Sequence, residues 1–172
     1  MGNNWKITDT LTKVFADEVP DGQGSIRLST LHRETVSCVI AYFGAADWGR
    51  YWKVSVKAPE KIETRLRRVE LVPSAYPCHK EQDDNYLRIV PGMYPDLLRD
   101  LDTEGDGADK KYLTKEVPGQ WRSLWLDVTV DAELAGGDYA IMIETETEDG
   151  EKETLKADLH LSLIHISEPT RR

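Results

Sequence analysis

Several groups of residues in this sequence have side chains that could support chemistry. Cys78 and His79 are adjacent and could form half of a metal site, but no CxxC or HxxH partner accompanies them. His32 and His160 stand apart from them and from each other in the sequence. We therefore expect no metal ion and no cofactor.

The acidic stretch 100–111, DLDTEGDGADKK, could bind calcium. Asp102, Glu104 and Asp106 occupy the first, third and fifth positions of an EF-hand-like loop. The twelfth position, which needs a bidentate carboxylate, is Leu113, and no convincing helices flank the stretch. We predict a solvated loop.

Pairs of carboxylates could act as general acid and base on a glycosidic bond, across a separation of about 5–10 Å. Asp83 and Asp84 are neighbours in a polar run, and Asp96 lies further on. Nothing in their spacing favours catalysis over loop capping and solvation. The sequence also lacks a Ser-His-Asp order, a Gly-rich phosphate cradle and a basic aromatic stripe. We predict no catalytic residue.

Aromatic residues near turns could bind a ligand without catalysing a reaction. Trp48, Tyr51, Tyr86 and Tyr94 could stack on sugar rings, as in carbohydrate-binding modules. Packing against the chain's own domain or a neighbouring domain is the favoured alternative. Both interpretations stay open at this point.

Two of these tyrosines lie in the stretch 76–98, which reads YPCHKEQDDNYLRIVPGMYPDLL. Its prolines disfavour a helix interior and its irregular pattern disfavours a strand, so we predict a long Pro/Tyr-rich loop. Long ordered loops in compact domains are usually functional or interfacial. We expect this one to dock, either over Trp121 and Trp125 or by presenting Tyr94, Pro95 and Asp96 to another domain.

Arg88 lies in the same stretch. We expect it to form an ion pair with Asp84 or Asp96, and we favour this structural role over substrate binding.

The elements that must position these residues are strands. Alternation and β-branched residues predict strands over 6–15, 25–31, 35–43, 50–58, 64–72, 120–130, 138–147 and 152–159. Turn signals separate them, and no amphipathic helix is convincing. The pattern predicts an all-β fold, a two-sheet antiparallel β-sandwich of immunoglobulin-like or jelly-roll type.

Three of these strands carry specific expectations. Residues 35–43 are apolar on both faces, which predicts a central strand with Cys38 as a small buried hydrophobe. In 64–72 we expect Val69 and Leu71 to point inward, and the arginines to point largely outward (Arg65, Arg67 and Arg68). In 120–130 the alternate residues from Leu124 to Val130 form an aliphatic core stripe, and the opposite stripe carries Trp121 and Trp125, which need a cover.

The last two strands predict a hairpin with a defined register. A two-residue turn at Asp149-Gly150 would set Ile143 against Lys156, a core residue against a solvent residue. A three-residue turn over 148–150, with Gly150 in the left-handed region, sets Ile143 against Leu155 instead. We predict the second register.

Bulk properties exclude several classes of protein. The chain has 172 residues, enough for one domain, and a formal net charge of −9. An acidic surface argues against nucleic-acid and anionic-membrane partners. The start lacks the features of a secretory signal, and no run approaches the roughly 18 apolar residues of a membrane span. We expect a cytoplasmic protein.

Residues 161–172 read LSLIHISEPTRR, which closely resembles the conceptual translation of a transposase-type sequencing adaptor. We therefore expect this tail to be non-native, so His165, Glu168 and Arg171 should carry no functional argument. The alternative is a native strand followed by a polar tail. Under the first interpretation the native domain spans 1–160 and its natural continuation is missing.

Four segments carry a resemblance to a known family: WKITDTLTKVFADE, VELVPSAYPC, DNYLRIVPGMYPDLL, and QWRSLWLDVTV followed by GGDYAI. Over residues 5–160 the chain resembles the N-terminal β-sandwich of bacterial glycoside-hydrolase-like proteins related to glycoside hydrolase family 123. The resemblance implies that a (β/α)-barrel with the catalytic carboxylates follows the sandwich. No catalytic residue can therefore be carried over to this sequence.

We expect residues 1–160 to form a non-catalytic accessory domain that docks against its own downstream catalytic domain. The alternatives are an independent carbohydrate-binding module and a structural interaction domain. The candidate residues for a domain interface or a carbohydrate contact are Trp48, Tyr51, Tyr86, Arg88, Tyr94, Pro95, Asp96, Trp121 and Trp125.

Overall fold

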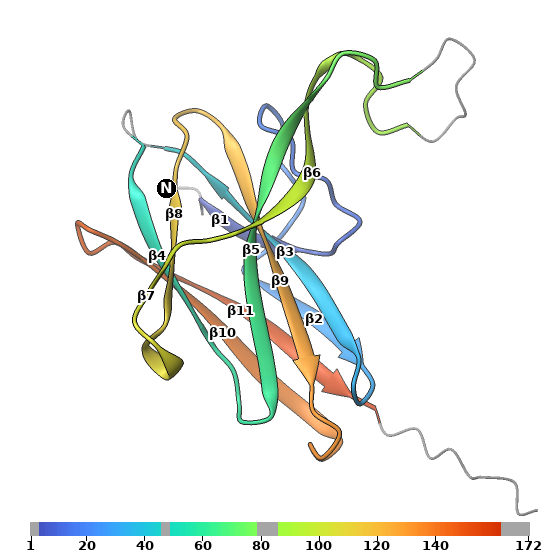
Figure 1. The fold of residues 1–172 in the computed structure, drawn as a ribbon, viewed down its shortest axis with the longest axis vertical. Coiled ribbons are helices and arrows are strands. Elements are labelled where there is room, and N and C mark those ends of the chain that lie inside the picture. Colours follow the sequence, from blue (N-terminus) through green and yellow to red (C-terminus); the bar gives the residue numbers. More distant parts are fainter. Residues whose placement is uncertain (1–3, 46–48, 79–85, 163–172) are drawn as a thin grey trace, which may run out of the picture.

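The computed structural model describes residues 4–45, 49–78 and 86–162. Two sheets pack face to face (Figure 1). The first sheet contains, in spatial order, β1 (Trp5–Thr8), β3 (Thr35–Phe43), β9 (Trp121–Val130), β5 (Ile62–Ser74) and β6 (Gly92–Asp100). The second contains β2 (Ser25–Thr30), β11 (Lys152–Leu161), β10 (Gly137–Thr147), β4 (Tyr51–Lys57), β8 (Lys111–Lys115) and β7 (Thr103–Glu104). The predicted all-β two-sheet sandwich is confirmed.

The strand order is immunoglobulin-like. In that fold one sheet runs A-B-E-D and the other contains C, F and G side by side. Here β1, β3, β9 and β5 take the first order, and β4, β10 and β11 take the second. The first strand of the fold is split, because β1 pairs with β3 while β2 crosses to the other sheet. There β2 runs parallel to β11, and the remaining described pairs of strands are antiparallel.

One continuous segment widens both sheets. Between β5 and β9 the chain adds β6 to the edge of the first sheet, then crosses to add β7 and β8 to the second. The short 3-10 helix η1 (Gly107–Asp109) connects β7 to β8. The predicted solvated loop around Asp102 and Leu113 is therefore a β-hairpin, in which the Leu113 N–H donates to the Asp102 carbonyl.

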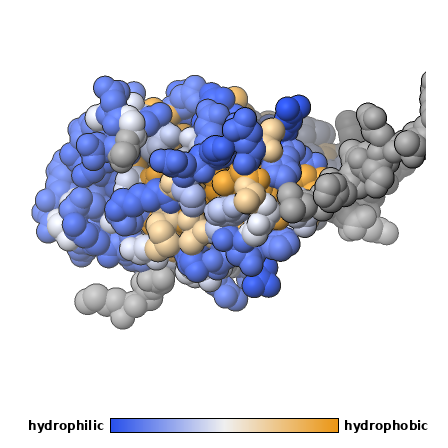
Figure 2. All heavy atoms as spheres, turned by 90° about the horizontal axis from the view of Figure 1, so that it is seen from below, coloured by the Kyte–Doolittle hydropathy of each residue, from blue (hydrophilic) through white to orange (hydrophobic). Residues whose placement is uncertain are grey.

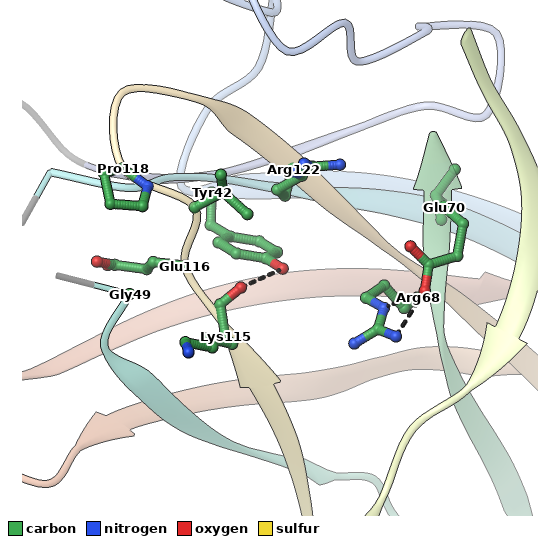
Figure 3. A pocket seen from close by; sticks show the side chains of 10 residues that line it. Tyr42, Gly49, Arg68, Glu70, Lys115, Glu116, Pro118 and Arg122 are labelled. Carbon is green, nitrogen blue, oxygen red and sulfur yellow. Dashed lines mark hydrogen bonds and ion pairs between the residues drawn. The ribbon is translucent and has the colours of Figure 1, made fainter. Parts of the chain in front are cut away.

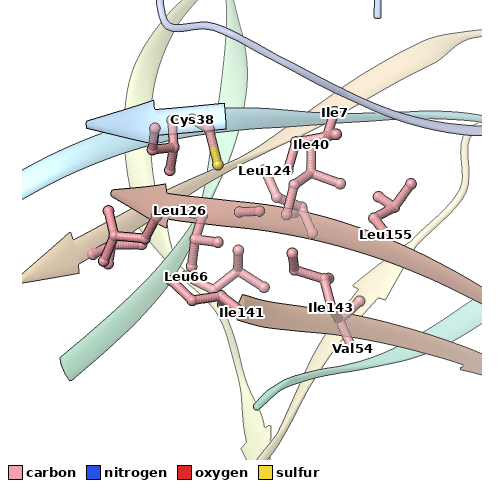
Figure 4. Packing of buried hydrophobic residues seen from close by; sticks show 14 of the residues in the cluster. Ile7, Cys38, Ile40, Val54, Leu66, Leu124, Leu126, Ile141, Ile143 and Leu155 are labelled. Carbon is pink, nitrogen blue, oxygen red and sulfur yellow. The ribbon is translucent and has the colours of Figure 1, made fainter. Parts of the chain in front are cut away.

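The core lies between the sheets (Figure 4). The predicted aliphatic stripe of β9 is there, with Leu124 and Leu126 fully buried against Ile40 and Leu66 of the neighbouring strands. Strand β3 is buried on both faces, as predicted, because Val39 and Ala41 join a second apolar cluster on the outer side.

The described part of the chain has no helix long and apolar enough to cross a membrane.

The β10–β11 hairpin has the predicted register. Ile143 pairs with Leu155, and Glu146 pairs with Lys152. Gly150 has φ of +83°, in the left-handed region that glycine adopts without strain. The three-residue turn over 148–150 keeps Ile143 and Leu155 together on the core face.

Two strand predictions are wrong in detail. The first strand ends at Thr8, because the Asp9 carboxylate accepts the N–H groups of Leu11 and Thr12 and turns the chain. In β5 the inward positions are those of Ile62, Leu66 and Arg68, which pair with the core stripe of β9, whereas Val69 and Leu71 are only half-buried. Val69 pairs with Ser123, which places it on the outer face of the sheet.

The predicted long loop is also shorter than expected. Strand β5 continues to Ser74 and β6 begins at Gly92, so residues 92–98 belong to a strand. Pro95 is tolerated there because β6 is an edge strand that neighbours only β5. The missing N–H of Pro95 therefore removes no hydrogen bond to a second neighbouring strand. The register shifts between Glu70 and Leu71, which leaves Asp96 as the unpaired residue of a bulge.

At the other end of the chain, β11 extends to Leu161, the first residue of the adaptor-like tail. Leu161 is buried in the core, and the Ser162 N–H donates to the Thr30 carbonyl. His165, Glu168 and Arg171 lie outside the described residues.

Seen from the end at the bottom of Figure 1, the surface is mainly hydrophilic, with apolar side chains gathered near its centre (Figure 2).

Candidate functional site

The ends of β5 and β6 nearest their connection project beyond the rest of the first sheet (Figure 1). We call this projection the arm, defined as residues 71–78 and 86–97. Pairing between β5 and β9 ends at Val69 and Ser123, so beyond that point β5 pairs only with β6 among the described strands. The arm carries most of the predicted candidate residues.

Arg88 fastens the arm to the connection between β1 and β2. Its guanidinium lies 3.9 Å from the centre of the Phe15 ring and pairs with Asp17, at 2.8 Å, and with Glu18. The hydrogen bond from Arg88 lowers the pKa of Asp17, and the same bond raises the pKa of Arg88. The prediction that Arg88 pairs with Asp96 is wrong, and Asp84 lies outside the described residues.

Tyr94 completes this contact from the strand side. Its ring packs edge-on against Phe15 at 5.7 Å, and its hydroxyl donates to the Val90 carbonyl at 2.6 Å. Phe15 therefore contacts Arg88 and Tyr94 and is almost completely buried. An aromatic ring between a cation and a second ring is stabilised by both.

A groove of about 540 Å³ lies along this contact. The structure brings five of the predicted candidates together there: Tyr86, Arg88, Tyr94, Pro95 and Asp96. Tyr86 and Asp96 are exposed, Tyr94 and Arg88 are half-buried, and Pro95 is buried. Phe15 and Lys13 complete the wall from the β1–β2 connection. Sequence reasoning missed both, because no local signal links residues so far apart in the chain.

The surface of the arm is unusually apolar. Tyr76 is 83% exposed, Leu87 73% and Val90 56%. Tyr86, Ile89, Met93 and Leu97 are each between 45% and 48% exposed. Of the ten large hydrophobic residues exposed in the described part of the chain, these seven belong to the arm. A concentration of exposed apolar side chains on one element marks an interaction surface.

The two tryptophans of β9 already have a cover within the chain. Trp121 is buried, its backbone N–H donates to the Ala16 carbonyl, and the Lys6 amine lies 5.3 Å from the centre of its ring. Val14 packs in the same cluster. The β1–β2 connection therefore covers this face, whereas the sequence predicts the 76–98 stretch or another domain as the cover. Trp125 is half-buried beside it.

Next to Trp125, one carboxylate joins three strands on the outer face of the first sheet. Asp127 accepts hydrogen bonds from Ser37 of β3, Arg67 of β5 and Trp125 of β9, at 2.7, 2.5 and 2.7 Å. Burial opposes ionisation of Asp127, but these hydrogen bonds outweigh it and hold its pKa below the usual value. The arrangement is structural.

The other candidates lie apart from the groove. Tyr51 is exposed at the start of β4, in the other sheet, with the Lys115 amine 5.1 Å from its ring. Trp48, His79 and Asp83 lie outside the described residues. Cys38 is buried as predicted, and burial raises the pKa of its thiol to about 12.

A second hollow lies between the sheets at one end of the sandwich (Figure 3). Its volume is about 420 Å³. It is lined by Tyr42, Gly49, Arg68, Val69, Glu70, Lys115, Glu116, Val117, Pro118 and Arg122. Sequence reasoning did not identify it. A signal was available, because extending the Leu124–Val130 stripe back by two residues reaches Arg122, a charged residue at an inward position.

Fold and site together define a two-sheet sandwich of immunoglobulin-like strand order with an apolar arm. No protein-family model and no curated protein sequence matches this chain. Solved structures do match it. One is a family 123 glycoside hydrolase from Clostridium perfringens, described in a study of glycolipid glycan hydrolysis. Its TM-score is 0.66 at 9% identity, over 93% of this chain and 27% of the hydrolase.

Two further structures align with lower scores. The N-terminal domain of PorA has a TM-score of 0.45 at 7% identity, over 92% of this chain and 97% of that domain. The C-terminal domain of the Streptococcus agalactiae AgI/II polypeptide BspA has a TM-score of 0.45 at 14% identity, over 94% of this chain and 50% of the other. This chain thus shares its fold with part of the hydrolase and spans about a quarter of that protein's length.

Proposed function

We propose that this chain is a non-catalytic accessory domain of a larger glycoside-hydrolase-like protein, and that the arm docks against a neighbouring domain of the same protein. The observation that carries the proposal is the concentration of exposed apolar side chains on the arm, led by Tyr76, Leu87 and Val90. Removing such surface from water stabilises a domain interface by about 25 cal/mol per Å².

Two further observations support a domain interface. The arm is attached to the body through Arg88 and Phe15, so it presents its apolar residues from a fixed position. A preorganised surface loses little conformational freedom on binding. In addition, the likeness to the family 123 hydrolase covers nearly all of this chain but only 27% of the hydrolase, as expected for one domain of several.

The first experiment has two parts. The gene that continues naturally beyond His160 is expected to encode a barrel with paired carboxylates. The purified chain by itself is expected to release no chromophore from aryl glycosides above the uncatalysed rate. Release of chromophore by the purified chain above the uncatalysed rate would contradict the accessory role. A stop codon or an unrelated downstream domain would contradict the hydrolase assignment.

Carbohydrate binding is the second candidate function. Tyr86 offers an exposed ring at the edge of the groove, and the Asp96 carboxylate lies on the same wall. An exposed ring beside a polar acceptor can stack on a sugar and bind its hydroxyls. On a glycan array this function requires a signal that Tyr86→Ala abolishes. Tyr51→Ala is the matched control, because Tyr51 has similar exposure but lies on the other sheet.

A further inference from the structure

The hollow at the end of the sandwich interrupts the apolar pattern of the core. Leu124 of β9 points inward, and the next inward position toward the start of the strand is Arg122. On the neighbouring strands Tyr42 pairs with Arg122, and Arg68 pairs with Leu124. Two guanidinium groups therefore occupy inward positions where the pattern of the strands predicts aliphatic residues.

The two guanidinium groups differ in how well they are paired. Arg68 donates to Glu70 through Nε at 2.8 Å and also through Nη2. Arg122 donates through Nη2 to the Gln120 side chain at 2.9 Å, but its buried Nε has no hydrogen-bond partner among the described residues. Buried donors without a partner are rare in folded proteins, and an absent ligand or water is one explanation.

The charged residues that line the hollow leave a small excess of positive charge. Glu116 is buried and already occupied, because it accepts the Trp52 indole N–H at 2.6 Å and pairs with Arg50. Glu70 is paired with Arg68. Arg122 remains, since the amine of Lys115, the other cation of the lining, lies 5.1 Å from the centre of the exposed Tyr51 ring.

The Tyr42 hydroxyl adds a neutral polar group. It hydrogen-bonds to the Thr114 hydroxyl at 2.8 Å. Burial raises the pKa of Tyr42, although the nearby charges of Arg68 and Arg122 partly offset this effect. The hydroxyl is therefore protonated at neutral pH.

We propose that this hollow binds a small organic carboxylate of about the size of one sugar ring, with Arg122 as its main partner. A guanidinium edge matches the two oxygens of a planar carboxylate. The positive excess suits a monoanion, whereas a phosphate dianion would meet the carboxylates of Glu70 and Glu116. The volume of about 420 Å³ is in the range of small-molecule sites. The proposal does not depend on the docking role of the arm.

The test measures binding of D-glucuronate to the whole chain by calorimetry, with D-glucose and inorganic phosphate as comparison ligands. We expect a Kd for glucuronate of about 1 mM or below. Glucose and phosphate should each bind at least about tenfold more weakly, since one lacks the charge and the other has the wrong shape and charge. No glucuronate binding, or equal binding of either comparison ligand, would overturn the proposal.

Variants with opposite expected effects separate binding from folding. Arg122→Gln should weaken glucuronate binding at least about tenfold. Glu70→Gln should strengthen it severalfold, because it removes a competing and repelling carboxylate. Arg65→Gln is the matched control, since Arg65 lies on the same strand as Arg68 but is exposed and pairs with Asp100. Circular dichroism confirms that each variant is folded. An effect of Arg122→Gln no larger than that of Arg65→Gln would refute the site.

Discussion

Asp127 joins three strands through one side chain, and its surroundings are polar enough to keep it ionised. Ser37, Arg67 and Trp125 all donate to its two oxygens. Hydrogen bonds to a charged group contribute more to stability than those between neutral groups, because the charge strengthens each of them. This carboxylate is therefore the residue outside the core whose loss should be felt most widely in the first sheet.

We expect Asp127→Asn to lower the free energy of unfolding by about 2 kcal/mol at neutral pH. The folded-state pKa of Asp127 lies below its unfolded value, so its stabilisation is complete above the unfolded pKa. It is lost as the pH falls through the folded pKa. Urea unfolding of both proteins from pH 7 to pH 2.5 measures the difference, which should shrink toward acid.

The control for this prediction is Asp138→Asn. Asp138 is highly exposed and pairs with His160 at 2.8 Å, so its replacement should cost at most about 0.5 kcal/mol. If Asp127→Asn costs no more than Asp138→Asn at neutral pH, Asp127 does not hold the strands together.

Among the elements, the arm depends most on a contact that is distant in sequence. Arg88 contacts Phe15, Asp17 and Glu18, which all lie in the β1–β2 connection. The acidic partners are exposed, so the ion pairs alone add little to global stability. Their effect should be local, on the arm.

We expect Arg88→Ala to accelerate hydrogen exchange of the backbone amides where the two strands of the arm pair, in residues 71–74 and 92–97, at least about tenfold, with little change in β9 and β10. Arg88→Lys should give an intermediate effect, because it keeps the charge but loses the flat group over Phe15. Arg65→Ala removes an exposed ion pair to Asp100 and should leave these amides unchanged. Unchanged exchange of these amides in Arg88→Ala would show that the contacts of Arg88 with Phe15, Asp17 and Glu18 do not order the arm.

The elements also show how far the sequence alone predicts this fold. The β10–β11 register could be predicted because the pairing of Ile143 with Leu155 and the left-handed Gly150 are local requirements. The core stripe of β9 followed from simple alternation. The inward position of Leu66 could not be predicted, because arginines surround it and both possible faces of β5 contain apolar residues.

The candidate site was less predictable than the fold. Alternation failed to identify β6 because Pro95 is normally excluded from strands, and only its position at a sheet edge permits it. The partners of Arg88 depend on where the β1–β2 connection packs, which no local pattern encodes. The parallel pairing of β2 with β11 likewise joins the two ends of the chain.

At the scale of the whole molecule, the arm makes the surface unevenly apolar despite the net charge of −9. A monomer with such an exposed patch should associate weakly through it. The surface charge opposes association over the rest of the molecule.

We expect sedimentation velocity to detect concentration-dependent association of this chain. Leu87→Ser with Val90→Ser should weaken it at least about tenfold, or about 1.4 kcal/mol. Leu11→Ser with Val19→Ser is the matched control, because these residues are 86% and 71% exposed but lie outside the arm. Association that both double variants weaken equally would mean that the patch is not specific.

The split first strand has a consequence for synthesis on the ribosome. Among the described strands, β2 pairs only with β11, so its backbone groups have no ladder partner until residues 152–161 have been made. At about 5–20 residues per second, the delay is on the order of ten seconds. During that time Ile26 and Leu28 belong to an open strand edge, which can pair with other chains. Slower translation of the last hairpin should therefore lower the yield of soluble protein, even though the finished fold is unchanged.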